Sequence, residues 1–212
     1  MSNESIWLQA GFLPLFEGVC YYPKGENPLS AEVFLIPGKE NIWFFDAGNG
    51  EGALRAIRSI PGRKKAVISH FHPDHMGNAL YAGFEQVYLG DFAFRKAQDK
   101  AKCICVTEKI EIEDGVSLCI LPLPSSHAKG SLMLEAGKLL FLGDGTYSTM
   151  KNGKAAYNAT VLRETLQALK ETQAEYVVQS HREPLIALRQ EVVGQMQSIY
   201  EKREKNQPYI LL

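Results

Sequence analysis

The sequence lacks long apolar runs and an excess of either charge. No stretch approaches the roughly 20 apolar residues that a membrane-spanning helix needs, so we expect no membrane association. Lys and Arg number 23 against 24 Asp and Glu, which leaves a net charge of −1 and a pI of about 6.5. Such a chain offers no general electrostatic field for nucleic acid or an anionic membrane, and we expect neither as a partner.

Residues 1–5 contain no basic leader and no apolar signal core, so we expect a cytoplasmic protein. In that compartment the four cysteines would be reduced. Cys103 and Cys105 have a spacing that fits no usual zinc pair. We interpret them as small apolar residues of a strand or loop, with metal binding or redox pairing as the alternative.

The composition is typical of a globular protein, with 45% hydrophobic and 22% charged residues. A chain of 212 residues is long enough for one sizeable domain. It contains no repeat, no low-complexity tract and no interdomain linker. We therefore expect residues 1–212 to form a single domain.

Three of the five histidines lie within six positions, in the segment His70-Phe71-His72-Pro73-Asp74-His75. Residues 65–69 read as a short buried strand, and along its continuation His70 and His72 point to the same side. Pro73 suits the first turn of a helix, which places Asp74 and His75 beside the strand end. Ordinary core or surface histidines are the structural alternative, and the clustering disfavours it. Imidazole and carboxylate together suit zinc or another divalent first-row metal.

Further polar residues follow apolar strands elsewhere in the chain. His127 follows the apolar run 116–122, Asp144 ends the run 139–142, and His181 follows the run 176–179. Asp46 closes the run 41–45 in the same way, although a turn or cap role explains it equally well. Side chains at strand ends are where an open sheet presents ligands to solvent, so these residues are candidates for the same site.

The remaining pattern predicts strands first and helices interleaved later. Residues 5–46 read as strands, including a hairpin with its turn at 37–40, and residues 109–143 supply more strands. Further strands are expected at 86–89 and 176–179, and helices at 52–60, 92–100, 161–172 and 185–202. This predicts an α/β (α+β) fold of two packed mixed sheets with helices outside.

In order and in type, these pieces resemble the motifs of the metallo-β-lactamase superfamily. The resemblance covers residues 46–181 and implies a four-layer αββα sandwich. It also implies that His70, His72 and His127 hold one metal, that Asp74, His75 and His181 hold another, and that Asp144 bridges them. Asp46 would then orient a metal ligand from behind.

The resemblance implies a hydrolase in which two divalent metals lower the pKa of a bridging water. The expected substrate is a small ester, thioester or lactone, and Asp74 would also orient the attacking hydroxide. Zinc is the first choice of metal, with iron or manganese as alternatives. The ligand set is like that of glyoxalase II and lactonases. The short segment after His181 leaves no room for the extra C-terminal domain of glyoxalase II.

Tyr147 lies three residues after Asp144, as in lactonases of this superfamily, and is a candidate hydrogen-bond donor to a developing oxyanion. Its alternative role is packing in the loop after the strand. Three lysines near the site segments, Lys129, Lys151 and Lys154, either attract an anionic substrate or simply face water.

Three alternatives remain open at this point. One is a two-metal phosphodiesterase. Another is a mononuclear iron enzyme resembling persulfide dioxygenases, which would use His70, His127 and Asp144. The last is a metal-binding module without catalysis. The sequence predicts neither the substrate's identity nor the oligomeric state.

Overall fold

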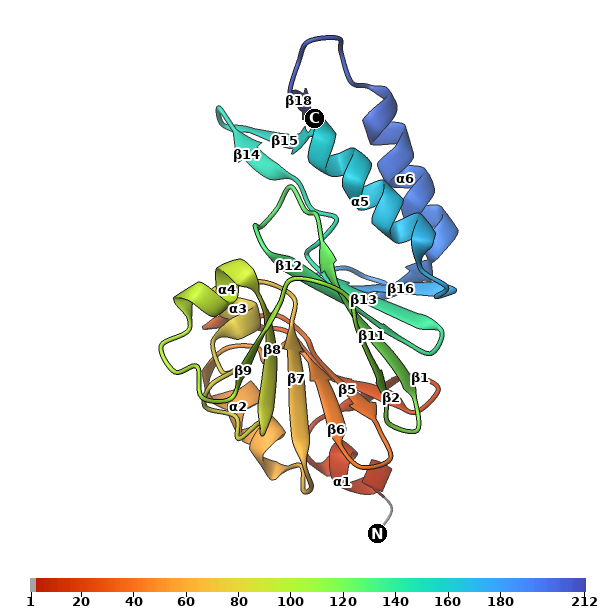
Figure 1. Cartoon of the computed structure of the whole chain (residues 1–212). Helices are drawn as coiled ribbons and strands as arrows, with labels where there is room; N and C mark the ends of the chain where they lie inside the picture. The colour runs from red at the N-terminus through yellow and green to blue at the C-terminus, as the bar shows by residue number, and fades with distance from the viewer. Residues whose placement is uncertain (1–2) are drawn as a thin grey trace.

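Both faces of the central strands are apolar, so both must be covered. In β5 (Val33–Pro37), Phe34 belongs to one hydrophobic core and Leu35 to another, because successive side chains of a strand point to opposite faces. The computed structural model, which describes residues 3–212, covers both faces: two β-sheets pack against each other and helices lie outside them (Figure 1).

The larger sheet of the described residues has the strand order β1-β2-β5-β6-β7-β8-β9. Strands β6 to β9 run parallel to one another, so their carboxyl ends meet at one edge. Besides β5, the strands are β1 (Leu13–Phe16), β2 (Val19–Tyr22), β6 (Ile42–Phe45), β7 (Lys64–Ile68), β8 (Gln86–Gly90) and β9 (Cys103–Val106). The helices on this side of the molecule are α1 (Asn3–Gln9), α2 (Gly50–Ser59), α3 (Pro73–Met76) and α4 (Asp91–Lys96).

The second sheet has the order β10-β11-β12-β13-β16-β17 within the same residues. Its strands β13 and β16 are parallel, and the pairing of the others is antiparallel. The strands are β10 (Ile110–Glu113), β11 (Ser117–Leu123), β12 (Ser131–Ala136), β13 (Leu139–Gly143), β16 (Tyr176–Gln179) and β17 (Ile186–Leu188). Helices α5 (Ala159–Glu171) and α6 (Arg189–Glu201) cover its outer face (Figure 1).

Two small sheets complete the part of the chain that the structure describes. Strands β14 (Thr149–Lys151), β15 (Lys154–Asn158) and β18 (Tyr209–Leu211) form one, and β3 (Gly25–Glu26) and β4 (Leu29–Ser30) form the other. Asn152 and Gly153 join β14 to β15 with φ values of 52° and 75°. Positive φ at both central residues is what a two-residue hairpin turn requires.

The core between the sheets is aromatic. The ring of Phe141 on β13 lies 5.4 Å from that of Phe34 and 5.5 Å from that of Phe45, between ring centroids. All three side chains are fully buried. Buried aromatic rings at these distances bring large apolar areas together and add favourable edge contacts, so this cluster joins the two sheets.

The predicted fold class is confirmed: two mixed sheets with outer helices form the four-layer αββα arrangement. The hairpin with its turn at 37–40 is confirmed as well, since β5 and β6 pair across it. No helix of the described residues is long and apolar enough to cross a bilayer. The single domain and the cytoplasmic location stay predictions.

The structure differs from the prediction at one helix that was missed and at two helices whose bounds were wrong. The prediction of strands from residue 5 misses α1, from which Ile6 and Trp7 pack against the larger sheet's outer core. The helix predicted at 185–202 begins only at α6, because the preceding residues pair with β16 as strand β17. The helix predicted at 92–100 ends with α4 at Lys96.

Candidate metal centre

The ends of strands from both sheets converge at one edge of the sandwich. Asp46 follows β6, His70 follows β7, Asp144 follows β13, and His181 lies just after β16. His127 comes from the connection between β11 and β12, and Asp74 and His75 lie in α3. The structure thereby brings together all seven side chains that the resemblance implies as metal ligands, in three overlapping groups.

The first group consists of three imidazole nitrogens. His72 Nδ1 lies 2.9 Å from His70 Nε2 and 3.1 Å from His127 Nε2. One ring nitrogen carries either one proton or one lone pair, so His72 Nδ1 cannot satisfy both neighbours by hydrogen bonding. Ligands of a tetrahedral zinc ion lie about 3.3 Å apart, given zinc–nitrogen bonds of about 2.0–2.1 Å. These three nitrogens therefore fit one metal ion.

The second group is centred on Asp74. Its Oδ2 lies 3.0 Å from His181 Nε2 and 3.4 Å from His75 Nε2. Asp144 lies between the two groups, with Oδ2 3.4 Å from His127 Nε2 and 3.5 Å from His75 Nε2. His75 Nε2 and Asp144 Oδ1 are buried and have no hydrogen-bond partner among the described residues. Unpaired buried donors or acceptors are rare, and metal ions would satisfy them.

Ser69 and Asp46 fix which nitrogen of two histidines faces this centre. Asp46 Oδ2 lies 2.9 Å from Ser69 Oγ and 2.7 Å from His75 Nδ1. A carboxylate only accepts, so Ser69 donates its single proton to Asp46, and its Oγ accepts from His70 Nδ1 at 2.9 Å. His70 and His75 thus each carry a proton on Nδ1, and the Nε2 atom of each ring points to the centre.

Backbone geometry supports this arrangement. Asp46 is fully buried at φ 62°, and its Oδ1 accepts the Ser69 N–H at 2.7 Å. Gly143, at φ 53°, lets β13 approach, since a Cβ there would lie 2.5 Å from Ser69 Oγ. His181 has φ 59°. Strained positive φ values at non-glycine residues cluster at functional sites, and two of them hold this one.

The pKa values of the side chains in this centre follow from burial and neighbouring charges. Burial and the surrounding histidines hold the pKa of His70 far below its usual range, and burial with His127 lowers that of His72. Burial also opposes the cation of His75, but Asp46 and Asp144 raise its pKa to about 10. Metal binding at His75 Nε2 would displace that proton, which the Asp46 carboxylate otherwise stabilises.

Asp74 and His181 form a pair with opposite shifts. Burial opposes the Asp74 carboxylate, but the hydrogen bond with His181 lowers its pKa. The same bond raises the pKa of His181. The carboxylate therefore persists near neutral pH, in the form that binds a metal.

Tyr147 lies beside the centre, with its ring 6.0 Å from the ring of His127. Its hydroxyl donates to the Ser180 carbonyl at 2.6 Å, and the Arg182 guanidinium stacks 5.1 Å above its ring. Burial, with the Asp144 charge, raises the pKa of Tyr147. The hydroxyl stays protonated, but it would have to leave Ser180 to serve a substrate.

The other singled-out residues lie outside the ligand groups. Lys129, Lys151 and Lys154 are exposed, and the Lys151 ammonium lies 4.8 Å from the ring of Tyr209. Cys103 and Cys105 are free thiols on β9.

Two contributors were missed from the sequence. Ser69 relays a hydrogen bond to Asp46, and the buried Glu32 accepts the His181 backbone N–H at 3.0 Å. Neither has a sequence signal: Ser69 is the residue before the histidine motif, and Glu32 lies next to an apolar strand with no motif of its own.

No protein-family model matches the sequence, and no curated protein matches it. Solved structures do match. One is a chemotaxis sensor ODP described as a peroxy diiron species, with 15% identity over 89% of this chain and 94% of that chain, and a TM-score of 0.68. Another is the metallo-β-lactamase SMB-1, with 13% identity over 91% and 95% of the two chains and a TM-score of 0.68.

A third is a metallo-β-lactamase from Pontibacter korlensis, with 17% identity over 91% of this chain and 99% of that chain, and a TM-score of 0.66. These identities show the fold alone. Together with the two mixed sheets and the outer helices, they show that the chain has the metallo-β-lactamase fold.

Proposed function

We propose that this protein is a metal-dependent hydrolase that cleaves a small ester, thioester or lactone with two divalent metal ions. The observation that carries the proposal is the convergence of two donor groups on either side of Asp144. One is the histidine trio His70, His72 and His127. The other is Asp74 with His75 and His181.

Two ions held by these groups would supply a water of lowered pKa and would polarise the oxygen of a substrate carbonyl. The side chains of this centre would orient the attacking water. Asp74 uses Oδ2 in its contacts with His75 and His181, which leaves Oδ1 to accept a proton from the attacking water and to orient it. No serine or cysteine nucleophile is required, so we expect no covalent enzyme intermediate.

The second donor group favours two metals over one. A mononuclear iron enzyme using His70, His127 and Asp144 would leave Asp74, His75 and His181 without a metal, although they lie within bonding reach of a common ion. Nitrogen and oxygen donors without thiolate suit zinc, iron and manganese alike. We propose zinc first, and a small-molecule substrate in the cytoplasm.

Metal content and turnover of the same preparation test the proposal. We expect two zinc ions per chain by elemental analysis, and hydrolysis of at least one member of a panel of lactones, thioesters and aryl esters. In Asp74→Ala the second group loses a ligand and the water loses its acceptor. We expect at most one tightly bound metal and a loss of turnover of at least about 1000-fold.

Asp99→Ala, at an exposed aspartate outside the centre, is the matched control and should keep wild-type metal content and rate. Near-wild-type turnover of folded Asp74→Ala would refute the two-metal mechanism. Activity on phosphodiesters alone would mean that the substrate is a phosphodiester and not an ester, thioester or lactone. A single iron per chain would point to oxygen chemistry instead.

A further inference from the structure

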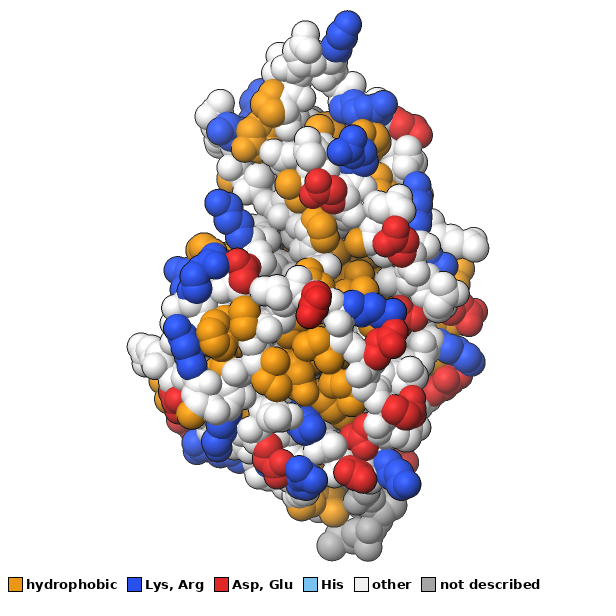
Figure 2. Space-filling view, in the orientation of Figure 1, with side chains coloured by type: hydrophobic (Ala, Val, Ile, Leu, Met, Phe, Trp, Pro, Cys, Tyr) orange, Lys and Arg blue, Asp and Glu red, His pale blue; other side chains and the backbone are white. Residues whose placement is uncertain are grey.

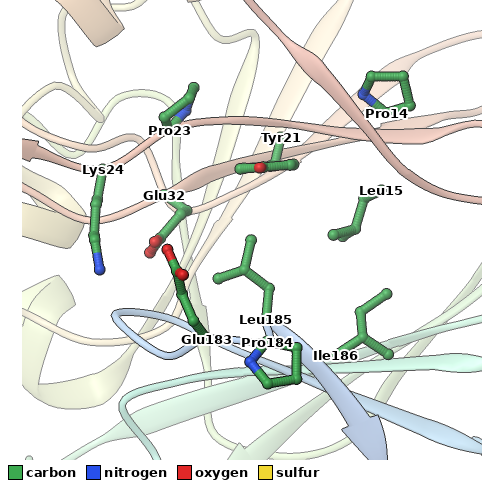
Figure 3. Close-up of a pocket in the computed structure, with 10 residues that line it drawn as sticks. All are labelled: Pro14, Leu15, Tyr21, Pro23, Lys24, Glu32, Glu183, Pro184, Leu185 and Ile186. Carbon is green, nitrogen blue, oxygen red and sulfur yellow. The ribbon is translucent and has the colours of Figure 1, made fainter.

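A cavity of about 650 Å³ lies beside the metal centre, at the side of the sandwich where the edge strands of the two sheets come together. Its walls come from β1 and β2 of the larger sheet and from residues 183–186, which follow the metal-ligand candidate His181 (Figure 3). The volume is that of a small-molecule site.

The cavity has an apolar side and a charged end. Leu15, Leu185 and Ile186 supply apolar surface. Glu32, Glu183 and Lys24 lie together at the other end, and Figure 3 shows the two carboxylates pointing toward each other. Two glutamates against one lysine leave this end negatively charged. An apolar pocket with a few convergent polar groups is the usual form of a ligand site.

Glu32 supplies one of the two carboxylates of this cavity. Its side chain is only 3% exposed, and its Oε2 accepts the His181 N–H. Its Oε1 has no hydrogen-bond donor among residues 4–212, and no ion pair of those residues includes Glu32 or Glu183. A cationic nitrogen donor in the cavity would pair with this carboxylate through a charge-assisted hydrogen bond.

Figure 2 shows the molecular face of Figure 1, on which acidic and basic side chains are interspersed. The general surface therefore does not select a ligand by charge on that face. The two carboxylates in the cavity favour a cationic ligand, because both lie at one end of an apolar pocket.

We propose that this cavity binds a small molecule that combines an apolar body with a protonated amine. The ammonium donates to Glu32 and Glu183, and the apolar body lies against Leu15, Leu185 and Ile186. The inference goes beyond the proposed hydrolysis, because binding here requires neither metal nor turnover.

Isothermal titration calorimetry with three probes of equal length tests it: n-hexylammonium, hexan-1-ol and hexanoate. We expect hexylammonium to bind at least about tenfold more tightly than the other two, since only its ammonium donates charged hydrogen bonds to the carboxylates. Glu183→Gln should remove most of this preference, whereas Glu113→Gln, at an exposed glutamate on β10, should leave it unchanged.

Glu32→Gln is the second variant, because its amide oxygen can still accept the His181 N–H while the charge is lost. It should weaken hexylammonium binding as Glu183→Gln does. Equal binding of all three probes, no binding of hexylammonium, or a preference that survives both variants would overturn the proposal. None of these outcomes affects the metal content or the hydrolysis of esters, so the two proposals fail separately.

Discussion

Single residues behind the candidate metal ligands decide how those side chains are oriented. The Asp46 carboxylate accepts from Ser69 and from His75, and Ser69 accepts from His70. This chain of bonds holds two imidazoles in the tautomer whose Nε2 lone pair faces the centre. Such outer hydrogen bonds typically contribute 10- to 100-fold to metal affinity.

Ser69→Ala removes the acceptor of His70 Nδ1 and is expected to lower metal affinity by about 10- to 100-fold, because the His70 ring loses its fixed tautomer. Competition with a chromophoric chelator measures the change. Ser59→Ala, at the end of α2, removes a comparable hydroxyl outside the centre and should leave the affinity unchanged. Equal affinities of wild type and Ser69→Ala would show that the relay has no role.

Tyr147→Phe tests the proposed donor to the substrate oxygen. We expect kcat for an ester or lactone to fall by about ten- to a thousandfold, with metal content unchanged. Because the hydroxyl donates to the Ser180 carbonyl, a packing role predicts lower stability at an unchanged kcat instead. Steady-state kinetics and urea unfolding of the same variant separate the two roles.

At the scale of elements, the buried carboxylate of Asp114 links a hairpin of the larger sheet to the second sheet. Asp114, in the turn between β10 and β11, accepts from the backbone of Glu40 at 2.7 Å and of Asn41 at 3.1 Å. It also accepts from the Asn41 amide at 2.9 Å and the Trp43 indole at 2.8 Å. The tip of the β5–β6 hairpin in one sheet is thereby attached to the other sheet.

These bonds make stability depend on pH at Asp114. Burial opposes the carboxylate, but the donors around it, led by Asn41, lower its pKa. A lowered folded-state pKa means that its contribution is present above the unfolded value of about 3.9 and is lost as pH falls through the folded value. Asp114→Asn is expected to destabilise the protein by about 1–3 kcal/mol at pH 7.

The difference between Asp114→Asn and wild type should shrink as the pH falls below about 4, where the unfolded wild-type chain takes up a proton at this carboxyl while the folded protein still resists it. Urea unfolding at pH 7 and pH 3 measures it, with Asp99→Asn as the exposed control. A pH-independent difference would mean that shape at this turn matters rather than charge.

At the scale of the whole molecule, the candidate metal centre lies where the two sheets meet. Asp46 and His70 come from the larger sheet, and Asp144 and His181 from the second. The sheets are also bonded directly there, through the Leu132 N–H and the Ser69 carbonyl at 2.7 Å. Metal ions at this place would therefore link the sheets, and their binding energy would add to global stability.

Metal removal is thus expected to lower the melting temperature. At a free metal concentration about a thousandfold above Kd, binding adds about 4 kcal/mol, which corresponds to roughly 10 °C for a chain of this size. Calorimetry with and without a chelator measures the shift. In Asp74→Ala the chelator should have a smaller effect, and an unchanged wild-type melting temperature would contradict a structural link through metal.

Local sequence was enough for the histidine motif at 70–75, because a strand end, a proline and a first helical turn place its donors within six residues. Local sequence did not predict the roles of Ser69 and Glu32, nor the strand β17. The roles of Ser69 and Glu32 come from partners 23 and 149 positions away, and β17 forms only because β16 offers an edge.

By itself the sequence determined the layers and the candidate donors. Continuous apolar runs require two covered faces on the central strands, and polar residues placed after those strands fall at the sheet edge. Only the tertiary structure decided which nitrogen each imidazole presents and which carboxylates share the cavity beside the centre. Those outcomes depend on contacts between residues far apart in the chain, and chain periodicity carries no information on them.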